Sequence, residues 1–115
     1  MPPTPAPLQA QDFGLSLTTL PSEAQAVALA QAIVAQGLGA CVQIIPLRSI
    51  YRWEGQVCNE TEWQLSIKLP RAGFEALSQF IRSQHPYQVP ELVMLPFLAG
   101  SDDYLGWVAA QVSGA

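Results

Sequence analysis

The stretch CVQIIPLRSIYRWEGQVCNETEWQLSIKL, residues 41–69, decides the fold. Its first part, 41–53, is rich in β-branched and aromatic residues, but Pro46 interrupts it and predicts a bulge or an edge position in a bent strand. Glu54 and Gly55 supply a turn. The return strand alternates polar and apolar residues, the apolar ones being Trp63, Leu65, Ile67 and Leu69. The stretch therefore predicts a long β-hairpin with one solvent-facing side.

The segment before this hairpin predicts a strand followed by a helix. Residues 12–20 alternate with period two, as a strand does. Ser22 and Gln25 have the spacing of a capping box, and the Ala-rich run that follows is typical of a helix to residue 36, closed by glycine at Gly37.

The segment after the hairpin predicts another helix and strand, then a last helix. An apolar stripe at helical spacing lies in residues 74–81 and must end before Pro86. Residues 92–98 resemble a short strand, and Ser101 is the expected N-cap of a C-terminal helix. This order predicts an α+β chain, a ferredoxin-like βαββαβ sandwich with a long hairpin and an extra C-terminal helix.

Composition limits the classes of partner. The chain of 115 residues fits one domain, which we place at 12–115, after a Pro-rich disordered tail at 1–11. A net charge of −4 argues against nucleic acid as a partner. Only 12% of the residues are charged, which predicts that some apolar surface meets another subunit. No apolar run is long enough to span a membrane and no secretory signal is recognisable, so we expect a cytoplasmic protein.

The segment QHPYQVPE, residues 84–91, holds the single histidine between a helix and a strand. Pro86 and Pro90 predict a rigid joint, with Tyr87 wedged against a neighbouring element. His85 would lie at a helix C-terminus, which favours an imidazolium. Alternatively, His85 could bind copper or zinc together with a second donor from Glu91 or from a cysteine such as Cys41. A cysteine at the start of a strand, as Cys41 is, is more often a small buried residue than a ligand.

The hairpin tip, SIYRWEG at residues 49–55, concentrates aromatic residues. Tyr51 and Trp53 should lie on one face, as in a strand at a subunit interface, with Glu54 on the other. The same residues could instead line a small-molecule crevice between subunits, which Lys68 could join. The sequence lacks a glycine-rich phosphate loop and a nucleophile with a visible base, so we expect no enzyme.

Two longer stretches resemble one known family. LTTLPSEAQAVALAQAIVAQGLGACVQIIPLRSIYRWEG at 17–55 and HPYQVPELVMLPFLAGSDDYLGWV at 85–108 resemble the CutA family of divalent-cation tolerance proteins, over about 12–112. The resemblance implies a homotrimer similar to the PII signalling proteins, without a settled enzymatic activity. It also implies copper binding by a cysteine near the end of the first strand and the histidine of HPY. Thr18 takes that cysteine's place and Gln84 precedes His85, so His85 alone remains of that site.

Two functional hypotheses follow from the residues and the resemblance. The first is a trimeric binding or signalling module that takes a small ligand or ion in clefts between subunits. Its expected cleft residues are Tyr51, Trp53, Glu54, Lys68 and Tyr87. The second is a protein that binds copper or another divalent cation through His85, assisted by Cys41 or Glu91. No cofactor is certain under either hypothesis, and the expected partner is a second copy of the chain.

Overall fold

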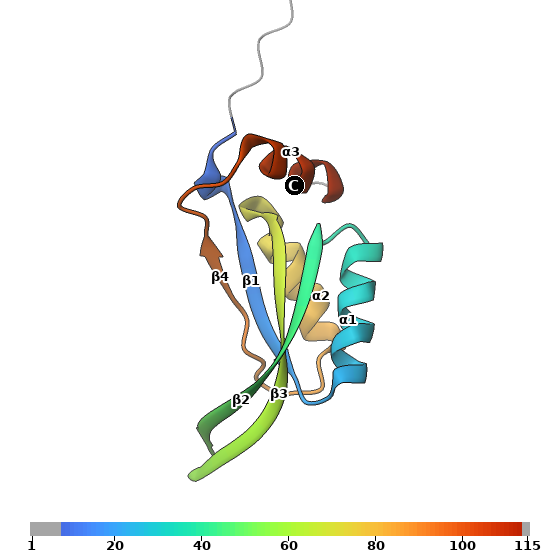
Figure 1. Ribbon diagram of the computed structural model, residues 1–115. Helices are drawn as coiled ribbons and strands as arrows, with labels where there is room; N and C mark the ends of the chain where they lie inside the picture. The colour runs from blue at the N-terminus through green and yellow to red at the C-terminus, as the bar shows by residue number, and fades with distance from the viewer. Residues whose placement is uncertain (1–7, 114–115) are drawn as a thin grey trace, which may run out of the picture.

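The structure is a computed structural model and describes residues 8–113. It contains one antiparallel sheet with the strand order β2-β3-β1-β4, with helices α1 and α2 packed on one face and α3 at one end (Figure 1). The elements are η1 (Ala10–Asp12), β1 (Phe13–Leu20), α1 (Glu23–Ala35), β2 (Cys41–Trp53), β3 (Gln56–Pro70), η2 (Arg71–Gly73), α2 (Phe74–Gln84), β4 (Val93–Pro96) and α3 (Asp102–Gln111). The predicted ferredoxin-like α+β fold with an extra C-terminal helix is confirmed.

The helix boundaries follow the signals in the sequence. The Ser22 hydroxyl accepts a hydrogen bond from the Gln25 amide at 3.2 Å and so caps α1. Gly37 follows α1 with a φ of 69°, a conformation that glycine adopts without steric cost. At α3 the Ser101 hydroxyl accepts from the Tyr104 amide, also at 3.2 Å. These caps satisfy backbone groups that the helices themselves leave unpaired.

The hairpin projects beyond the rest of the sheet. Its register runs without interruption from Cys41 opposite Lys68 to Trp53 opposite Gln56, so Pro46 lies in an edge strand and forms no bulge. A two-residue turn at Glu54 and Gly55, with φ of 49° and 79°, closes it.

Only part of the hairpin pairs with β1, whose last residue, Leu20, lies opposite Trp63. Residues 47–53 and 56–62 pair only with each other, and we call them the hairpin arm. In Figure 1 the arm extends past the ends of β1 and β4. It therefore lacks the support of a third strand.

The two faces of the sheet differ in what covers them. On the helix-covered face, Leu65, Ile67 and Leu69 of β3 are fully buried. β1 presents small and polar residues there, since Ser16 and Thr18 lie opposite Ile67 and Leu65 and are also fully buried.

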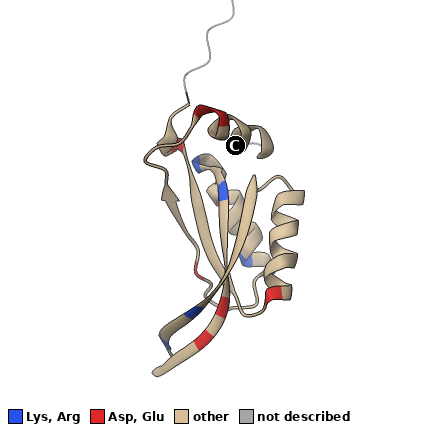
Figure 2. Cartoon of the chain, in the orientation of Figure 1, with Lys and Arg blue, Asp and Glu red and all other residues tan. Residues whose placement is uncertain are grey.

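The other face, which we call the open face, is not uniformly polar. Leu15 and Leu17 of β1 are directed to it and lie opposite Leu95 and Val93 of β4. Val93, Leu95 and Ile45 are about half exposed, which corrects the expectation that this face is simply solvent-facing. Figure 2 shows that Lys, Arg, Asp and Glu are sparse over the sheet and helices, while the arm carries both signs of charge.

The N-terminal segment is only partly described. Residues 1–7 of the predicted tail lie outside the described residues, and its last two residues, Ala10 and Gln11, belong to η1. Among residues 8–113 no helix has the length and apolar character needed to cross a membrane.

Candidate functional site

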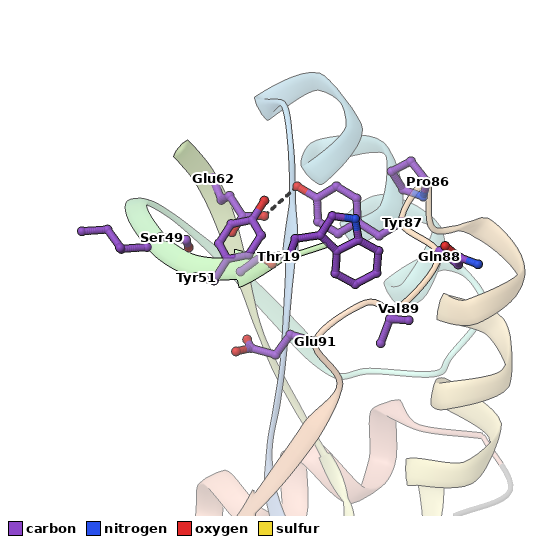
Figure 3. A pocket seen from close by; sticks show the side chains of 11 residues that line it. Thr19, Ser49, Tyr51, Glu62, Pro86, Tyr87, Gln88, Val89 and Glu91 are labelled. Carbon is purple, nitrogen blue, oxygen red and sulfur yellow. Dashed lines mark hydrogen bonds between the residues drawn. The ribbon is translucent and has the colours of Figure 1, made fainter. Parts of the chain in front are cut away.

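A pocket lies where the hairpin arm leaves the sheet, between the arm and the connection from α2 to β4. Its volume is about 640 Å³. In Figure 3, Tyr51 and Glu62 reach it from the arm, while Tyr87, Val89 and Glu91 reach it from the connection. The lining residues are Thr19, Ser49, Ile50, Tyr51, Trp53, Glu62, Pro86, Tyr87, Gln88, Val89 and Glu91.

A hydrogen bond between Tyr87 and Glu62 joins the two walls of the pocket. The Tyr87 hydroxyl donates to Oε2 of Glu62 at 2.6 Å, a short contact as expected for a carboxylate acceptor. Glu62 is only 5% exposed although it belongs to the polar alternation of β3. Burial, together with the bond to Glu62, raises the pKa of Tyr87, so the phenol stays protonated and keeps donating.

His85 links the connection between α2 and β4 to strand β1 through hydrogen bonds to two backbone groups. Its Nδ1 accepts a hydrogen bond from the Tyr87 amide at 3.1 Å, and its Nε2 lies 2.7 Å from the Thr19 carbonyl oxygen. An amide can only donate and a carbonyl can only accept, so the proton of a neutral ring is on Nε2. Burial lowers the pKa of His85, so the imidazolium expected at the end of α2 is disfavoured.

The aromatic side chains of the arm form another part of the pocket. Tyr51 and Trp53 line it from the same face of β2, as their alternation predicts. The Tyr51 hydroxyl donates to Glu60 at 2.9 Å, and this hydrogen bond raises the pKa of Tyr51 to about 12. The ring of Tyr87 packs on that of His85, with centroids 4.9 Å apart.

Two of the residues expected in the crevice between subunits do not line this pocket. Glu54 occupies the hairpin turn and does not line the pocket. Lys68 is on the open face, where its ammonium group donates to Gln43 and Ser66, and it does not line the pocket either. Burial lowers the pKa of Lys68.

The residues expected to bind a metal belong to no group of three or more candidate ligands in the described part of the chain. Both ring nitrogens of His85 are already bonded to backbone groups. Cys41 pairs with Lys68 at the register of Leu15, whereas His85 contacts Thr19, further along β1. Within residues 8–113 no group of three or more His, Cys, Asp or Glu side chains could hold a metal ion. The arrangement therefore does not fit the predicted copper site.

The position that the resemblance assigns to a metal-binding cysteine also points elsewhere. Thr18 is fully buried on the helix-covered face, and its hydroxyl has no hydrogen-bond partner in the described part of the chain. The neighbouring residue, Thr19, lines the pocket and binds His85 through its carbonyl oxygen. A thiolate at position 18 would point into the core rather than into the pocket.

Sequence reasoning missed the most deeply buried residue of the pocket, Glu62. Glu62 belongs to the polar positions of the alternation in β3, with Gln64 and Lys68, and this place predicts an exposed side chain. It is buried because the connection that carries Tyr87 covers it, and that contact spans 25 residues of sequence. Glu62 lies next to Trp63, where the core meets the arm. Nothing in the neighbouring sequence distinguishes it from an ordinary exposed glutamate.

These features define the class of protein: a small ferredoxin-like domain with a pocket between a projecting β-hairpin and a proline-fixed connection. The chain belongs to the family described as CutA1 divalent ion tolerance protein, whose sequence model matches residues 15–111.

Individual relatives agree with this assignment. The divalent-cation tolerance protein CutA of Thermus thermophilus is 44% identical over 93 residues, covering 80% of this chain and 90% of the relative. The protein of the same name from Escherichia coli is 42% identical over 97 residues, covering 84% and 87%.

Solved structures have the same fold. CutA from Synechococcus elongatus superposes with a TM-score of 0.87 at 43% identity, covering 92% of this chain and 95% of that one. CutA1 from Oryza sativa gives a TM-score of 0.86 at 33% identity, covering 90% and 95%. The likeness therefore extends over the sheet, the helices and the hairpin.

Proposed function

We propose that this protein acts in divalent-cation tolerance as a homotrimeric, PII-like binding or signalling module, and not as an enzyme. The names of its relatives support the role in tolerance. The observation that carries a binding role is the pocket of about 640 Å³ between the arm and the connection, which combines aromatic walls with a buried carboxylate. Small-ligand sites typically have volumes of about 300–1,000 Å³ and this kind of lining.

Self-association is supported by surfaces that a single chain leaves uncovered. The open face carries Leu15, Leu17, Val93 and Leu95, and β2 and β4 are both edge strands. Exposed edges and apolar sheet faces favour association with another chain. In a homotrimer the arms of neighbouring subunits would complete the pocket walls, so that the ligand is taken in clefts between subunits.

The test of the assembly is a mass measurement by light scattering over micromolar dilution. We expect the mass of three chains, and unfolding whose midpoint rises with protein concentration. A mass of one chain, about 12.4 kDa, at every concentration would contradict the homotrimer.

The test of the binding role is a thermal-shift screen of metabolites, nucleotides and divalent metals, repeated with Trp53→Leu. Binding of a small molecule that raises the melting temperature only when Trp53 is present supports the pocket as the site. The alternative, copper binding through His85, requires a stoichiometric copper site that is lost in His85→Gln. The bonded state of both ring nitrogens argues against that outcome.

A further inference from the structure

The charge of the pocket lining has one sign. Glu62 and Glu91 line the pocket, and none of the five Lys and Arg residues of the chain does. Two of these cations are bonded elsewhere, since Arg48 donates to Asn59 and Lys68 to Gln43. The pocket therefore attracts positive charge and disfavours phosphates and carboxylates.

Glu62 is a buried carboxylate without a cationic partner in the described part of the chain. It is 5% exposed, and its carboxylate accepts one hydrogen bond from the described residues, which Tyr87 donates to Oε2. The nearby imidazole of His85 is held neutral, with both of its nitrogens bonded to the backbone. Burying a carboxylate without a counter-charge is unfavourable, and a cation supplied by a ligand would remove that penalty.

The aromatic walls add a second preference. Tyr51, Trp53 and Tyr87 all line the same pocket. The faces of such rings attract cations, including alkylammonium and guanidinium groups, because the π electrons are concentrated on the ring face. A carboxylate surrounded by aromatic rings is therefore suited to an organic cation. Two carboxylates would leave most of the coordination shell of a divalent metal ion to water, and no group of three or more His, Cys, Asp or Glu side chains that could hold such an ion occurs in residues 8–113.

We propose that the pocket takes a small organic cation, whose ammonium or guanidinium group pairs with Glu62 and whose carbon skeleton lies against Tyr51 and Trp53. This inference rests on the proposed function, because it assumes that the pocket is the ligand site, and it specifies the chemical class of that ligand. Glu91 lines the same pocket and offers a second carboxylate to a ligand with two cationic groups.

The experiment compares three probes of similar size and different charge by calorimetric titration of the full chain. They are phenethylammonium, 2-phenylethanol and 3-phenylpropionate. We expect phenethylammonium to bind about tenfold or more tightly than the other two, since one charge-assisted hydrogen bond accounts for such a factor. The variant Glu62→Gln should lose that advantage, while Glu75→Gln, an exposed residue of α2, should retain it.

A second variant keeps the test valid if Glu62→Gln folds poorly. Trp53 is 43% exposed on the arm, so Trp53→Leu should leave the fold intact and weaken phenethylammonium by about threefold or more. If 3-phenylpropionate binds as tightly as phenethylammonium and its binding depends on Trp53, the pocket is a ligand site but the proposed preference for a cation is wrong. If none of the three probes binds, the cation proposal is wrong, and the thermal-shift screen decides the proposed function separately.

Discussion

Strand β3 passes through two environments: one half is buried in the core, and the other half is exposed in the hairpin arm. From Trp63 onward it lies between β1 and β2 under the helices, and Leu65, Ile67 and Leu69 are fully buried. Residues 56–62 form half of the hairpin arm, where Val57 is 70% exposed. The alternation of residues along a strand defines its two faces, but only a covering layer turns one face into a core.

The arm receives little support from the rest of the chain, since its two strands pair only with each other. An isolated two-stranded hairpin is marginally stable in water. Among the described residues, the hydrogen bond from Tyr87 to Glu62 at its base is the one side-chain hydrogen bond that joins the arm to the rest of the chain. We infer that ligand binding and assembly both stabilise the arm, whereas the helix-covered half of the sheet is stable through its own packing.

The largest expected effect compares the same residue type in the two regions. Ile67 is 0% exposed in the core and Ile50 is 68% exposed on the arm. Ile67→Ala should lower the free energy of unfolding by about 2–5 kcal/mol, because it leaves a cavity. Ile50→Ala should lower it by less than about 1 kcal/mol. Urea unfolding of both variants measures this, and equal losses would contradict the distinction between arm and core.

The next comparison separates the open face from an ordinary helix surface. Val93 on the open face and Val34 on α1 are both 46% exposed. If the open face is buried between subunits, Val93→Asp places an uncompensated charge there and should weaken assembly by about 3 kcal/mol or more. Val34→Asp should leave assembly unchanged. Sedimentation over a dilution series measures the mass, and an intact trimer for Val93→Asp would place the interface elsewhere.

A smaller effect is expected where the connection meets the arm. Tyr87→Phe removes the hydroxyl that donates to the buried Glu62, so the free energy of unfolding should fall by about 1–3 kcal/mol. The matched control is Tyr104→Phe in α3, because the Tyr104 hydroxyl makes no hydrogen bond to the described residues. Urea midpoints should therefore separate the two variants. If both behave alike, the bond to Glu62 contributes nothing net to stability.

The sequence predicted the parts of this molecule that local chemistry determines. The caps at Ser22 and Ser101, the turn at Glu54 and Gly55, and the edge position of Pro46 all follow from backbone preferences of nearby residues. The alternation of β3 likewise predicted the buried side of its core half.

The sequence did not predict the parts that depend on distant contacts. Glu62 is buried only because a tyrosine 25 residues away covers it. The His85 tautomer is determined by the Thr19 carbonyl, 66 residues earlier. Lys68 lies on the open face, as its place in the alternation predicts, but it is further along β3 than Glu62, beside Gln43, and so does not reach the pocket. Pairings of this kind are set by the packed fold and have no local signature.

The smallest expected effect concerns pH and sharpens the role of the connection. Burial lowers the folded-state pKa of His85 below its usual 6.5, so the folded chain holds the imidazole neutral more strongly than the unfolded chain does. Between the two pKa values the unfolded state binds more protons, and stability therefore rises with pH. The contribution is fully present above about pH 6.5 and is lost as the pH falls through the folded-state pKa.

Protonation of His85 should destabilise the folded chain because Nδ1 of the neutral ring accepts a hydrogen bond from the Tyr87 amide. A protonated ring would place two donors against each other there and loosen the connection, and with it the wall of the pocket that Tyr87 forms. We expect the urea concentration at the unfolding midpoint of the natural chain to decrease as the pH is lowered from about 7 to about 5. His85→Gln should flatten this part of the pH profile, because glutamine does not titrate. If the variant has the same slope as the natural chain, then carboxylates, and not His85, account for the acid sensitivity.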